Sequence, residues 1–428
     1  MVNFNFTSFW INSRYAFQFG MLARPIALLF LTVIIAHRWP MGEIAKFESF
    51  GLFQYFIFFS WLPAWGLSFI RMGSKRNSED QKSFLFSVFI SGFVLSLALC
   101  LVLLIFMTGL LPWESKDWQL TGKAITILLS YYISNTSIYR FYLQKKMASQ
   151  WLYGGIQFLG IIFFAWICSD FKAFIQQYFW FTCAFIMYEF TQQKWSRTFF
   201  NFDFWKEVAV YSLYFAMGSF ITIICAYAVQ RNFGLGNELS VYRYGTREIP
   251  LIPVLLSAFG LSFLKSSAED ILPVLSQMKT GMAKLILLMV PVLLIIVIFG
   301  KEIFEFLYGN NFDQSAYLMA TFSLIYLFRF IPSNMVLQLL NDKKRILMIS
   351  ILELIFILAG LVFLNESLNL IQIVWLLIIG TCLERMLQVF ILWKKYKIPI
   401  QQYLPVRLFL ICSFIMLIFY SIVWTGAH

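Results

Sequence analysis

Charged residues are scarce in this chain of 428 residues, since Asp, Glu, Lys and Arg together make up 13% of it. Hydrophobic residues make up 60% and aromatic residues 20%, far from the averages of soluble globular domains. Apolar runs of about twenty residues recur from end to end, which is the length needed to cross a bilayer core of roughly 30 Å. The sequence therefore predicts an all-α polytopic membrane protein.

Histidine and long loops are nearly missing as well. The two histidines are His37, at a predicted helix end, and His428, the last residue. No predicted loop exceeds about twenty residues, which leaves no room for a soluble catalytic domain. A membrane-embedded acyltransferase or glycan polymerase would need a catalytic base or an acceptor-binding loop. The sequence therefore argues against an enzyme, and we expect the function to take place within or beside the bilayer.

Paired cysteines and a concentrated basic surface are also lacking. The six cysteines occur singly in or beside apolar runs, which predicts neither disulfides nor a metal site: Cys100, Cys168, Cys183, Cys225, Cys382 and Cys412. The net charge of +12 comes from short basic clusters between apolar runs, so membrane topology explains it and no nucleic-acid partner is expected. The first apolar run is too long for a signal-peptide core and lacks a small-residue cleavage site, so no separate signal peptide is expected.

Thirteen apolar runs are predicted to span the membrane. They cover residues 15–37, 48–70, 83–110, 121–143, 149–167, 171–191, 207–230, 239–264, 282–306, 314–340, 345–364, 369–393 and 403–425. Short cytoplasmic loops carry an excess of Lys and Arg. With a cytoplasmic N-terminus, the basic segments "RMGSKRNSEDQK", "KWSR", "KSSAED", "DKKR" and "KKYK" all fall inside. The pattern therefore predicts a cytoplasmic N-terminus and, if the thirteenth span is real, an outer C-terminus.

An internal repeat is visible at an offset of 194 residues. The second span ends in "GLSFIR" (66–71) and the eighth in "GLSFLK" (260–265), and the same shift lays the other spans of one half on those of the other. Each half has an even number of helices, so the repeats are parallel and related by an axis along the membrane normal. The prediction is a six-helix lobe at 1–200, a second at 201–395 and one additional helix in 396–428, which makes twelve or thirteen spans. Two such lobes are typical of transporters with a substrate site between them and alternating access.

Three segments resemble polysaccharide-type flippases of the multidrug/oligosaccharidyl-lipid/polysaccharide (MOP) exporter superfamily. "IIAHRWPMGEIAKFESFGLFQYFIFFSWLPAWGLSFIR" (34–71) resembles the first hairpin of that family, with its "R-x-x-x-x-E" turn. "VYRYGTREIPLIPVLLSAFGLSFLKS" (241–266) resembles the cavity-lining eighth helix, and "GKEIFEFLYGNNFDQSAYLM" (300–319) resembles the loop before the tenth. Ala45 stands about where the family usually has glycine. The major facilitator type, by contrast, has a Gly/Asp/Arg-rich loop that "RMGSKRNSEDQK" does not match.

The resemblance implies a multi-pass flippase of the bacterial inner membrane. Its substrate would be an undecaprenyl-pyrophosphate-linked oligosaccharide, such as an O-antigen repeat unit, moved from the cytoplasmic to the periplasmic leaflet. Membrane lipids and the glycan polymerase machinery are the further partners considered, and no cofactor is implied. A small-solute or drug exporter of the same superfamily, or of the major facilitator type, is the alternative.

Arginines inside the predicted spans are the candidate substrate-binding residues: Arg24, Arg243, Arg247 and Arg329. Charges in a membrane helix are costly and face a bundle interior or a wet cavity. Guanidinium groups bind phosphate oxygens in pairs and stay charged at any pH, which suits a pyrophosphate headgroup. Arg243 and Arg247, four residues apart, are expected on one face of the eighth helix. The alternative is structural: Arg243 could reach the outer interface, and Arg385 and the preceding Glu384 could pair with neighbouring helices.

Carboxylates and helix breakers complete the candidate site. Four intramembrane glutamates are candidates either for coupling transport to protons or sodium or for neutralising arginines: Glu189, Glu248, Glu353 and Glu384. A hinge in the eighth helix is predicted at Gly245, Pro250 and Pro253, because proline removes a backbone donor and clashes with the preceding turn.

Overall fold

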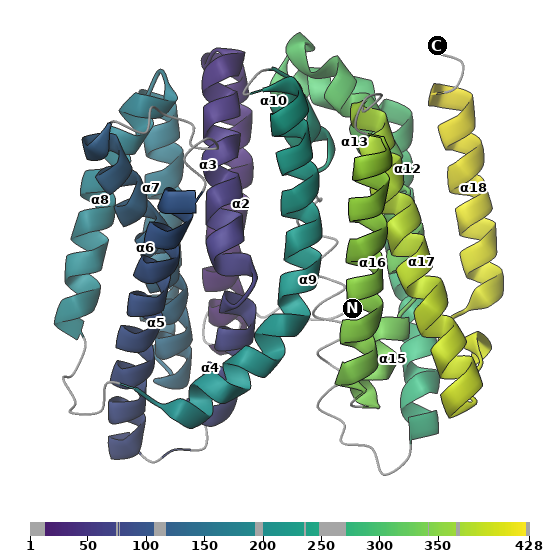
Figure 1. Cartoon of the computed structure of the whole chain (residues 1–428), viewed down its shortest axis with the longest axis horizontal. Helices are drawn as coiled ribbons and strands as arrows, with labels where there is room; N and C mark the ends of the chain where they lie inside the picture. Colours follow the sequence, from purple (N-terminus) through teal and green to yellow (C-terminus); the bar gives the residue numbers. More distant parts are fainter. Residues whose placement is uncertain are drawn as a thin grey trace, which may run out of the picture. The chain divides into compact units, whose positions relative to one another are not determined.

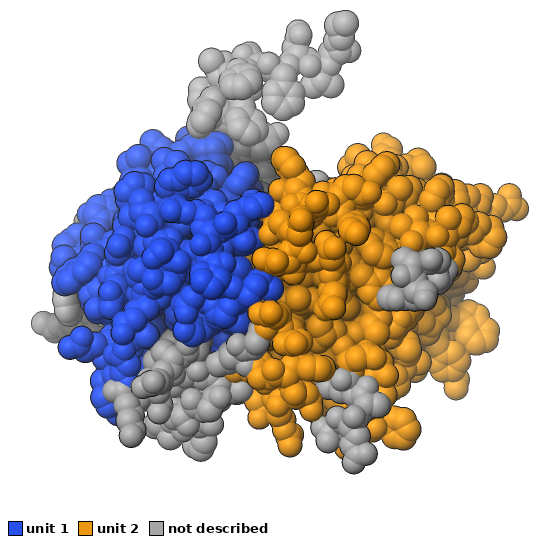
Figure 2. Space-filling view, turned by 90° about the horizontal axis from the view of Figure 1, so that it is seen from above, with its two compact units in different colours: residues 1–219 blue, residues 220–428 orange. Residues whose placement is uncertain are grey.

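The chain divides into two compact units, Met1–Ser219 and Phe220–His428, and each is treated separately below (Figure 2). The computed structural model describes residues 13–73, 76, 78–106, 117–192, 200–234, 237–247, 271–340, 342–364 and 369–424. Every element within these ranges is a helix (Figure 1). The boundary between the units lies within one long helix, α9 (Phe202–Phe233).

The first unit contains seven helices that lie wholly before α9. They are α2 (Ser13–Arg38), α3 (Met41–Phe59), α4 (Leu62–Gly73), α5 (Ser78–Phe106), α6 (Trp118–Leu143), α7 (Met147–Ile167) and α8 (Phe171–Gln192). Helices α3 and α4 together form one bent pair, with an angle of 44° between them. Pro63 stands in the first turn of α4, where a missing backbone donor is tolerated.

The second unit has a short helix, a long one, three short ones in series, and three long C-terminal helices. They are α10 (Asn237–Gly245), α12 (Ile271–Tyr308), α13 (Asp313–Ser323), α14 (Ile325–Arg329), α15 (Ser333–Leu339), α16 (Lys343–Phe363), α17 (Leu370–Tyr396) and α18 (Val406–Trp424), with short 3₁₀ turns at Asn310–Phe312 and Ile400–Gln402. Pro332 precedes α15 and separates it from α14, because proline cannot continue the hydrogen-bond ladder. The predicted thirteenth span is a helix, α18.

Membrane crossing follows from helix length and composition. Within the described ranges, eight helical segments are long and apolar enough to cross a bilayer, or nine if the bent α3–α4 pair is one span. The predicted spans 121–143, 171–191 and 207–230 are not among them, yet they coincide with the long helices α6, α8 and α9. The protein is a multi-pass, all-α membrane protein.

The helix bounds repeat between the two units. Shifted by 194 residues, α5 becomes 272–300, which lies within α12. The same shift takes α7 to 341–361, within two residues of α16 at each end. These bounds support the internal repeat inferred from the sequence. That the repeats form two six-helix lobes related by an axis along the membrane normal stays a prediction.

The turn of the first hairpin is shorter than predicted. The sequence predicts a loop over 38–47, but α2 runs to Arg38 and α3 begins at Met41, with Pro40 as its N-cap. The Trp39 indole donates to the Cys168 carbonyl at 2.9 Å. The Glu43 carboxylate accepts the Phe171 backbone N–H at 3.2 Å, at the start of α8, where a negative charge favours the helix N-terminus. The "R-x-x-x-x-E" turn thus docks the hairpin on the α7–α8 connection.

Helices α2 and α7 approach closely at a pair of glycines. A Cβ added to Gly154 would lie 3.2 Å from the Gly20 Cα and 3.1 Å from the Phe19 ring. The backbones can approach this closely because neither glycine carries a side chain, a common device between membrane helices. The contact holds α2, which carries Arg24, against α7.

Replacing Gly154 by valine should therefore separate these helices. Overpacking of a close contact costs about 1–3 kcal/mol, so the variant should unfold at a clearly lower temperature. Gly155→Val is the matched control, because a Cβ on Gly155 meets nothing within 4 Å and the change in helix propensity is the same. The measurement is the apparent melting temperature of both variants in the same detergent. Equal melting temperatures would contradict the role assigned to Gly154.

The C-terminal helix α18 belongs to the packed second unit. Its Trp424 indole donates to the Val297 carbonyl of α12 at 2.7 Å. The Tyr420 hydroxyl lies 2.9 Å from the Thr321 hydroxyl of α13. Both contacts tie α18 to helices inside the predicted repeat, so it has a structural role in this unit.

Asp342 joins the start of α16 to the end of α17. One carboxylate oxygen accepts hydrogen bonds from Tyr396, Arg345 and Lys395. Burial alone would raise the pKa of Asp342, but these three donors outweigh it and lower the pKa to about 2. The carboxylate is therefore ionised at neutral pH and partly neutralises the basic segments "DKKR" and "KKYK".

Candidate functional site

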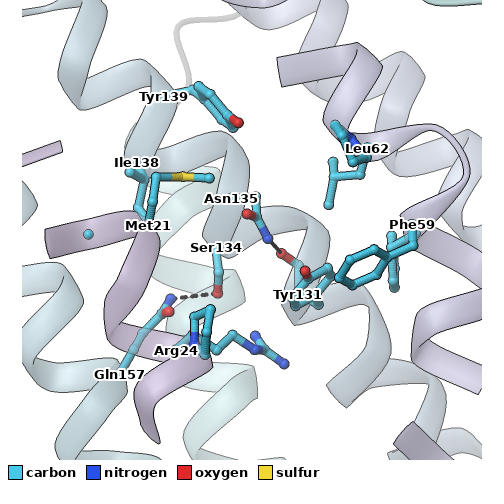
Figure 3. Close-up of a pocket in the computed structure, with 14 residues that line it drawn as sticks. Met21, Arg24, Phe59, Leu62, Tyr131, Ser134, Asn135, Ile138, Tyr139 and Gln157 are labelled. Carbon is cyan, nitrogen blue, oxygen red and sulfur yellow. Dashed lines mark hydrogen bonds between the residues drawn. The ribbon is translucent and has the colours of Figure 1, made fainter. Parts of the chain in front are cut away.

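A cavity of about 220 Å³ in the first unit brings together residues of five helices (Figure 3). Helix α2 contributes Arg24, the α3–α4 bend contributes Phe59 and Leu62, and α6 and α7 contribute most of the polar groups. The cavity thus lies beside the bend between α3 and α4. The cavity is called the Arg24 pocket below.

Arg24 is the cation of this pocket. It is 7% exposed, and its guanidinium carbon lies 4.5 Å from the centre of the Tyr131 ring. Its Nε has no hydrogen-bond partner, and across the described residues no carboxylate lies within ion-pair distance of Arg24. A buried cation that lacks an acidic partner is unfavourable, and a cation–π contact offsets only part of that. The pocket is therefore suited to an anion.

Amides, hydroxyls and aromatic rings line the rest of the Arg24 pocket. The Gln157 side-chain amide donates to the Ser134 hydroxyl at 2.5 Å, and the Asn135 amide donates to the Tyr131 carbonyl at 2.8 Å (Figure 3). The Tyr139 and Phe59 rings lie on the wall. Amides with aromatic faces are the groups that bind polar ligands with apolar ring faces, such as sugars.

Sequence reasoning found Arg24 but missed its partners in the pocket. Gln157 and Asn135 were assigned to apolar spans with no separate role. A signal was available, because "SYYISNTSIYR" (130–140) places many polar residues within a predicted span. Polar residues in a membrane helix face the bundle interior.

Glu189 has a partner that the sequence analysis also missed. The Arg140 guanidinium donates to its carboxylate at 2.7 Å, and the two side chains are 7% and 0% exposed. Arg140 lies in the last turn of α6, and the sequence analysis did not single it out. The pair joins α6 to α8, which favours the charge-neutralising alternative for Glu189 over a coupling role.

Arg243 and Arg247 do not share a helical face, contrary to the prediction. Helix α10 ends at Gly245, so Arg243 lies in its last turn and Arg247 beyond it. A Cβ on Gly245 would lie 2.5 Å from the Leu318 Cβ, so this glycine is needed where α10 packs against α13. The Arg247 guanidinium instead lies over the Tyr244 ring at 5.0 Å.

Three of the predicted residues lie outside the described ranges: Glu248, Pro250 and Pro253. The hinge at Gly245, Pro250 and Pro253 therefore stays a prediction, although α10 does end at Gly245. Arg24 belongs to the first unit, and the other three candidate arginines belong to the second. That the four line one cavity also stays a prediction.

Arg329, Glu353 and Glu384 come together with Arg385 in the second unit. Both arginines act electrostatically on the Glu353 carboxylate, as does Glu384. The Arg385 Nε lies 3.5 Å from the carboxylate of its sequence neighbour Glu384. The four side chains, two cations and two anions, come from α14, α16 and α17.

The fold matches solved structures along most of the chain. The lipid II flippase MurJ, in an inward closed conformation, superposes with a TM-score of 0.65 at 16% sequence identity, covering 96% of this chain and 93% of that one. A multidrug resistance MATE family transporter of the MOP superfamily, in an inward-facing conformation, gives a TM-score of 0.64 at 13% identity, covering 87% and 94%. A MOP superfamily transporter from Pyrococcus furiosus gives a TM-score of 0.58 at 10% sequence identity, covering 89% of this chain and 93% of that one.

No protein-family model and no curated protein sequence matches the chain. The three solved structures are a flippase and transporters, and no enzyme is among them. Identities of this size establish the fold and leave the substrate open. The chain has the fold of the multidrug/oligosaccharidyl-lipid/polysaccharide exporter superfamily.

Proposed function

We propose that this protein is a flippase that moves a polyprenyl-pyrophosphate-linked oligosaccharide from the cytoplasmic to the periplasmic leaflet of a bacterial inner membrane. The observation that carries the proposal is Arg24, a buried arginine that faces a pocket and is not neutralised by a described carboxylate. Its fork of donors matches the oxygens of a phosphate. An anionic ligand would provide the missing counter-charge.

The dimensions of the Arg24 pocket agree with part of such a substrate. A volume of about 220 Å³ is below the roughly 300–1,000 Å³ typical of pockets for drug-sized ligands. It suits a pyrophosphate group or a single sugar ring. Further sugars and the polyprenyl chain would lie elsewhere, and Arg243, Arg247 and Arg329 are the proposed contacts of the second unit.

The solved relatives support the same class of function. One is a flippase for lipid II by its name, and the proposed substrate extends that chemistry to a lipid-linked glycan such as an O-antigen repeat unit. A drug exporter is the second candidate, favoured by the MATE family transporter with a TM-score of 0.64. The unneutralised cation of the Arg24 pocket argues against cationic drugs, because like charges repel.

Transport is proposed to follow alternating access, with the N-terminus in the cytoplasm. The excess of Lys and Arg in the loops assigned to the cytoplasm supports this orientation, by the positive-inside rule. No covalent step is required, because the lipid-linked sugar moves intact from one leaflet to the other. The glycan polymerase machinery remains a proposed partner on the periplasmic side.

Reconstituted vesicles test the proposal directly. The full chain is placed in proteoliposomes with a fluorescent undecaprenyl-pyrophosphate-linked sugar, and accessibility of the sugar to an external lectin is followed over time. We expect the fraction of sugar accessible to the lectin to change only when the protein is present, as the lipid-linked sugar moves from one leaflet to the other. An equally fluorescent cationic drug should not be transported. Transport of the drug alone would assign the protein to the exporters instead.

A further inference from the structure

Two arginines are buried in the first unit, and they are held in different ways. Arg24 of α2 is 7% exposed, and Arg140 of α6 is 5% exposed. The Arg140 guanidinium donates to the Glu189 carboxylate at 2.7 Å, so an acidic side chain balances its charge. No ion pair or hydrogen bond joins Arg24 to a residue that the structure describes, and its guanidinium lies over the Tyr131 ring instead.

The contact between Arg24 and Tyr131 joins α2 to α6. The guanidinium carbon lies 4.5 Å from the ring centre, within the distance of about 6 Å at which a cation–π contact is attractive. Both residues line the Arg24 pocket, and Figure 3 shows the guanidinium next to Tyr131. The ring attracts the cation through the electrons of its face and offers no strong acceptor. The contact therefore leaves the paired N–H donors of Arg24 to another ligand.

Tyr131 is itself held in place by its neighbours. Its ring packs against the Phe58 ring of α3, with centroids 5.1 Å apart. Phe58 is fully buried, so the Tyr131 ring rests on a part of the core. The Tyr131 backbone carbonyl accepts from the Asn135 side-chain amide at 2.8 Å, one turn further along α6. The ring thus offers Arg24 a fixed support.

A ring and a carboxylate have different consequences for an anion that enters the pocket. A carboxylate beside the guanidinium, such as Glu189 beside Arg140, occupies its donors and cancels its charge. An anionic ligand would have to compete with that carboxylate. A ring offsets part of the cost of burying the guanidinium but leaves the positive charge in the pocket. Arg24 is therefore held in place and remains able to bind phosphate oxygens.

We propose that Tyr131 is a positioning residue that holds the Arg24 guanidinium, by a cation–π contact, in the orientation that binds an anionic ligand; this rests on the proposed function, in which Arg24 contacts the pyrophosphate. Tyr131 acts through Arg24 and need not touch the phosphate. Without the ring, the long arginine side chain samples several rotamers, and binding must then restrict them. Loss of the ring therefore weakens binding although the charge of Arg24 remains.

Substitutions at Tyr131 test this role. The full chain in nanodiscs is titrated with an undecaprenyl-pyrophosphate-linked monosaccharide. Tyr131→Leu removes the ring but keeps an apolar side chain, and we expect its Kd to rise about tenfold, which corresponds to about 1.4 kcal/mol. Tyr131→Phe keeps the ring face and should bind as the wild type does. A Tyr131→Phe variant that binds as weakly as Tyr131→Leu would overturn the cation–π role, because the hydroxyl would then carry the effect.

Tyr142→Leu is the matched control. Tyr142 lies on the same helix, is half-buried like Tyr131 and packs against the Phe17 ring at 4.4 Å, but it is not a lining residue of the pocket. Each leucine variant loses one aromatic contact, so both should melt at a somewhat lower temperature. Only Tyr131→Leu should lose affinity. An equal rise in Kd in Tyr142→Leu would assign the effect to α6 packing in general and overturn the positioning role.

The electrostatic part of the contact can be weakened with little change in the size of the ring. Trifluorophenylalanine in place of Tyr131 withdraws electrons from the ring face that attracts the cation. We expect its Kd to lie well above that of Tyr131→Phe and close to that of Tyr131→Leu. In an Arg24→Gln background, Tyr131→Leu should cause no further loss, because the ring then has no cation to hold. Additive losses would contradict the assignment.

A further readout does not depend on the substrate. The ring current of Tyr131 should shift the NMR signal of the Arg24 Nε–H group, which is assigned by its absence in Arg24→Gln. Tyr131→Phe should keep the shifted signal, and Tyr131→Leu should lose it. Undiminished affinity in Tyr131→Leu would overturn the positioning role and leave the proposed function standing. A wild type that does not bind the lipid-linked sugar would overturn both, and the NMR signal would still show whether Tyr131 holds Arg24.

Discussion

Replacing Arg140 by methionine is expected to lower the free energy of unfolding by about 3–5 kcal/mol, because it leaves the Glu189 carboxylate buried without its cation. The donor lies 2.7 Å from the carboxylate, and Glu189 is 0% exposed. Water cannot replace the lost partner at such a site. One Glu189 oxygen already lacks a hydrogen bond among the described contacts, and the variant removes the cation that donates to the other.

A double variant separates the cost of a broken pair from the value of an intact one. Arg140→Met with Glu189→Leu removes both charges and fills the space with apolar atoms, which is often neutral or stabilising. We expect it to recover most of the stability lost in Arg140→Met. SDS-induced unfolding of the three proteins measures this. If the double variant were as unstable as the single one, the loss would come from packing of the Arg140 side chain and not from the uncompensated charge.

Replacing Arg24 by glutamine is expected to reduce transport of the lipid-linked sugar by about 100-fold. Glutamine keeps a hydrogen-bond donor but loses the charge and the paired geometry. Two charge-assisted hydrogen bonds to phosphate contribute about 3 kcal/mol in total, which corresponds to roughly that factor. Arg24→Lys should fall between glutamine and the wild type, because an ammonium keeps the charge without the planar fork.

Stability makes the Arg24 test specific. Removing a buried cation that has no described carboxylate partner should leave the melting temperature unchanged or raise it, while transport is lost. A structural arginine would show the opposite, with lower stability in the variant. Arg407→Gln, at an exposed position at the start of α18, is the control and should change neither property.

The sequence predicted the helices of this fold well where the length of an apolar run determines the helix bounds. The apolar runs place α2, α5, α7 and α16 within a few residues, since a bilayer fixes the length of a crossing helix. The eighth span, 239–264, was predicted with a hinge at Gly245; α10 ends at that glycine, and residues 248–264 lie outside the described ranges. The close packing of α13 against Gly245 joins distant segments, and no local pattern in the sequence contains that contact.

The site was predicted only in part, for a similar reason. Arg24 is a charged residue within an apolar run, so one segment of sequence is enough to show that its side chain would be unfavourable in contact with lipid. Arg140 and Glu189 are 49 residues apart, and their pairing depends on α6 packing against α8. Glu384, Gln388 and Ser333 form one chain of hydrogen bonds, and they come from two helices. These pairings depend on which distant segments pack together, and a single sequence does not give those distances.

The most direct test of the account is ligand-induced thermal stabilisation of the purified protein. An undecaprenyl-pyrophosphate-linked sugar is compared with a neutral polyprenol of the same length, because both share the apolar chain and only one carries the anion. A ligand at 100 times its Kd stabilises the state that binds it by about 2.7 kcal/mol. The account predicts that the pyrophosphate lipid raises the melting temperature of the wild type, that Arg24→Gln loses this shift, and that the polyprenol has little effect on either. Equal shifts with both lipids, or a full shift in Arg24→Gln, would contradict an anion site at Arg24.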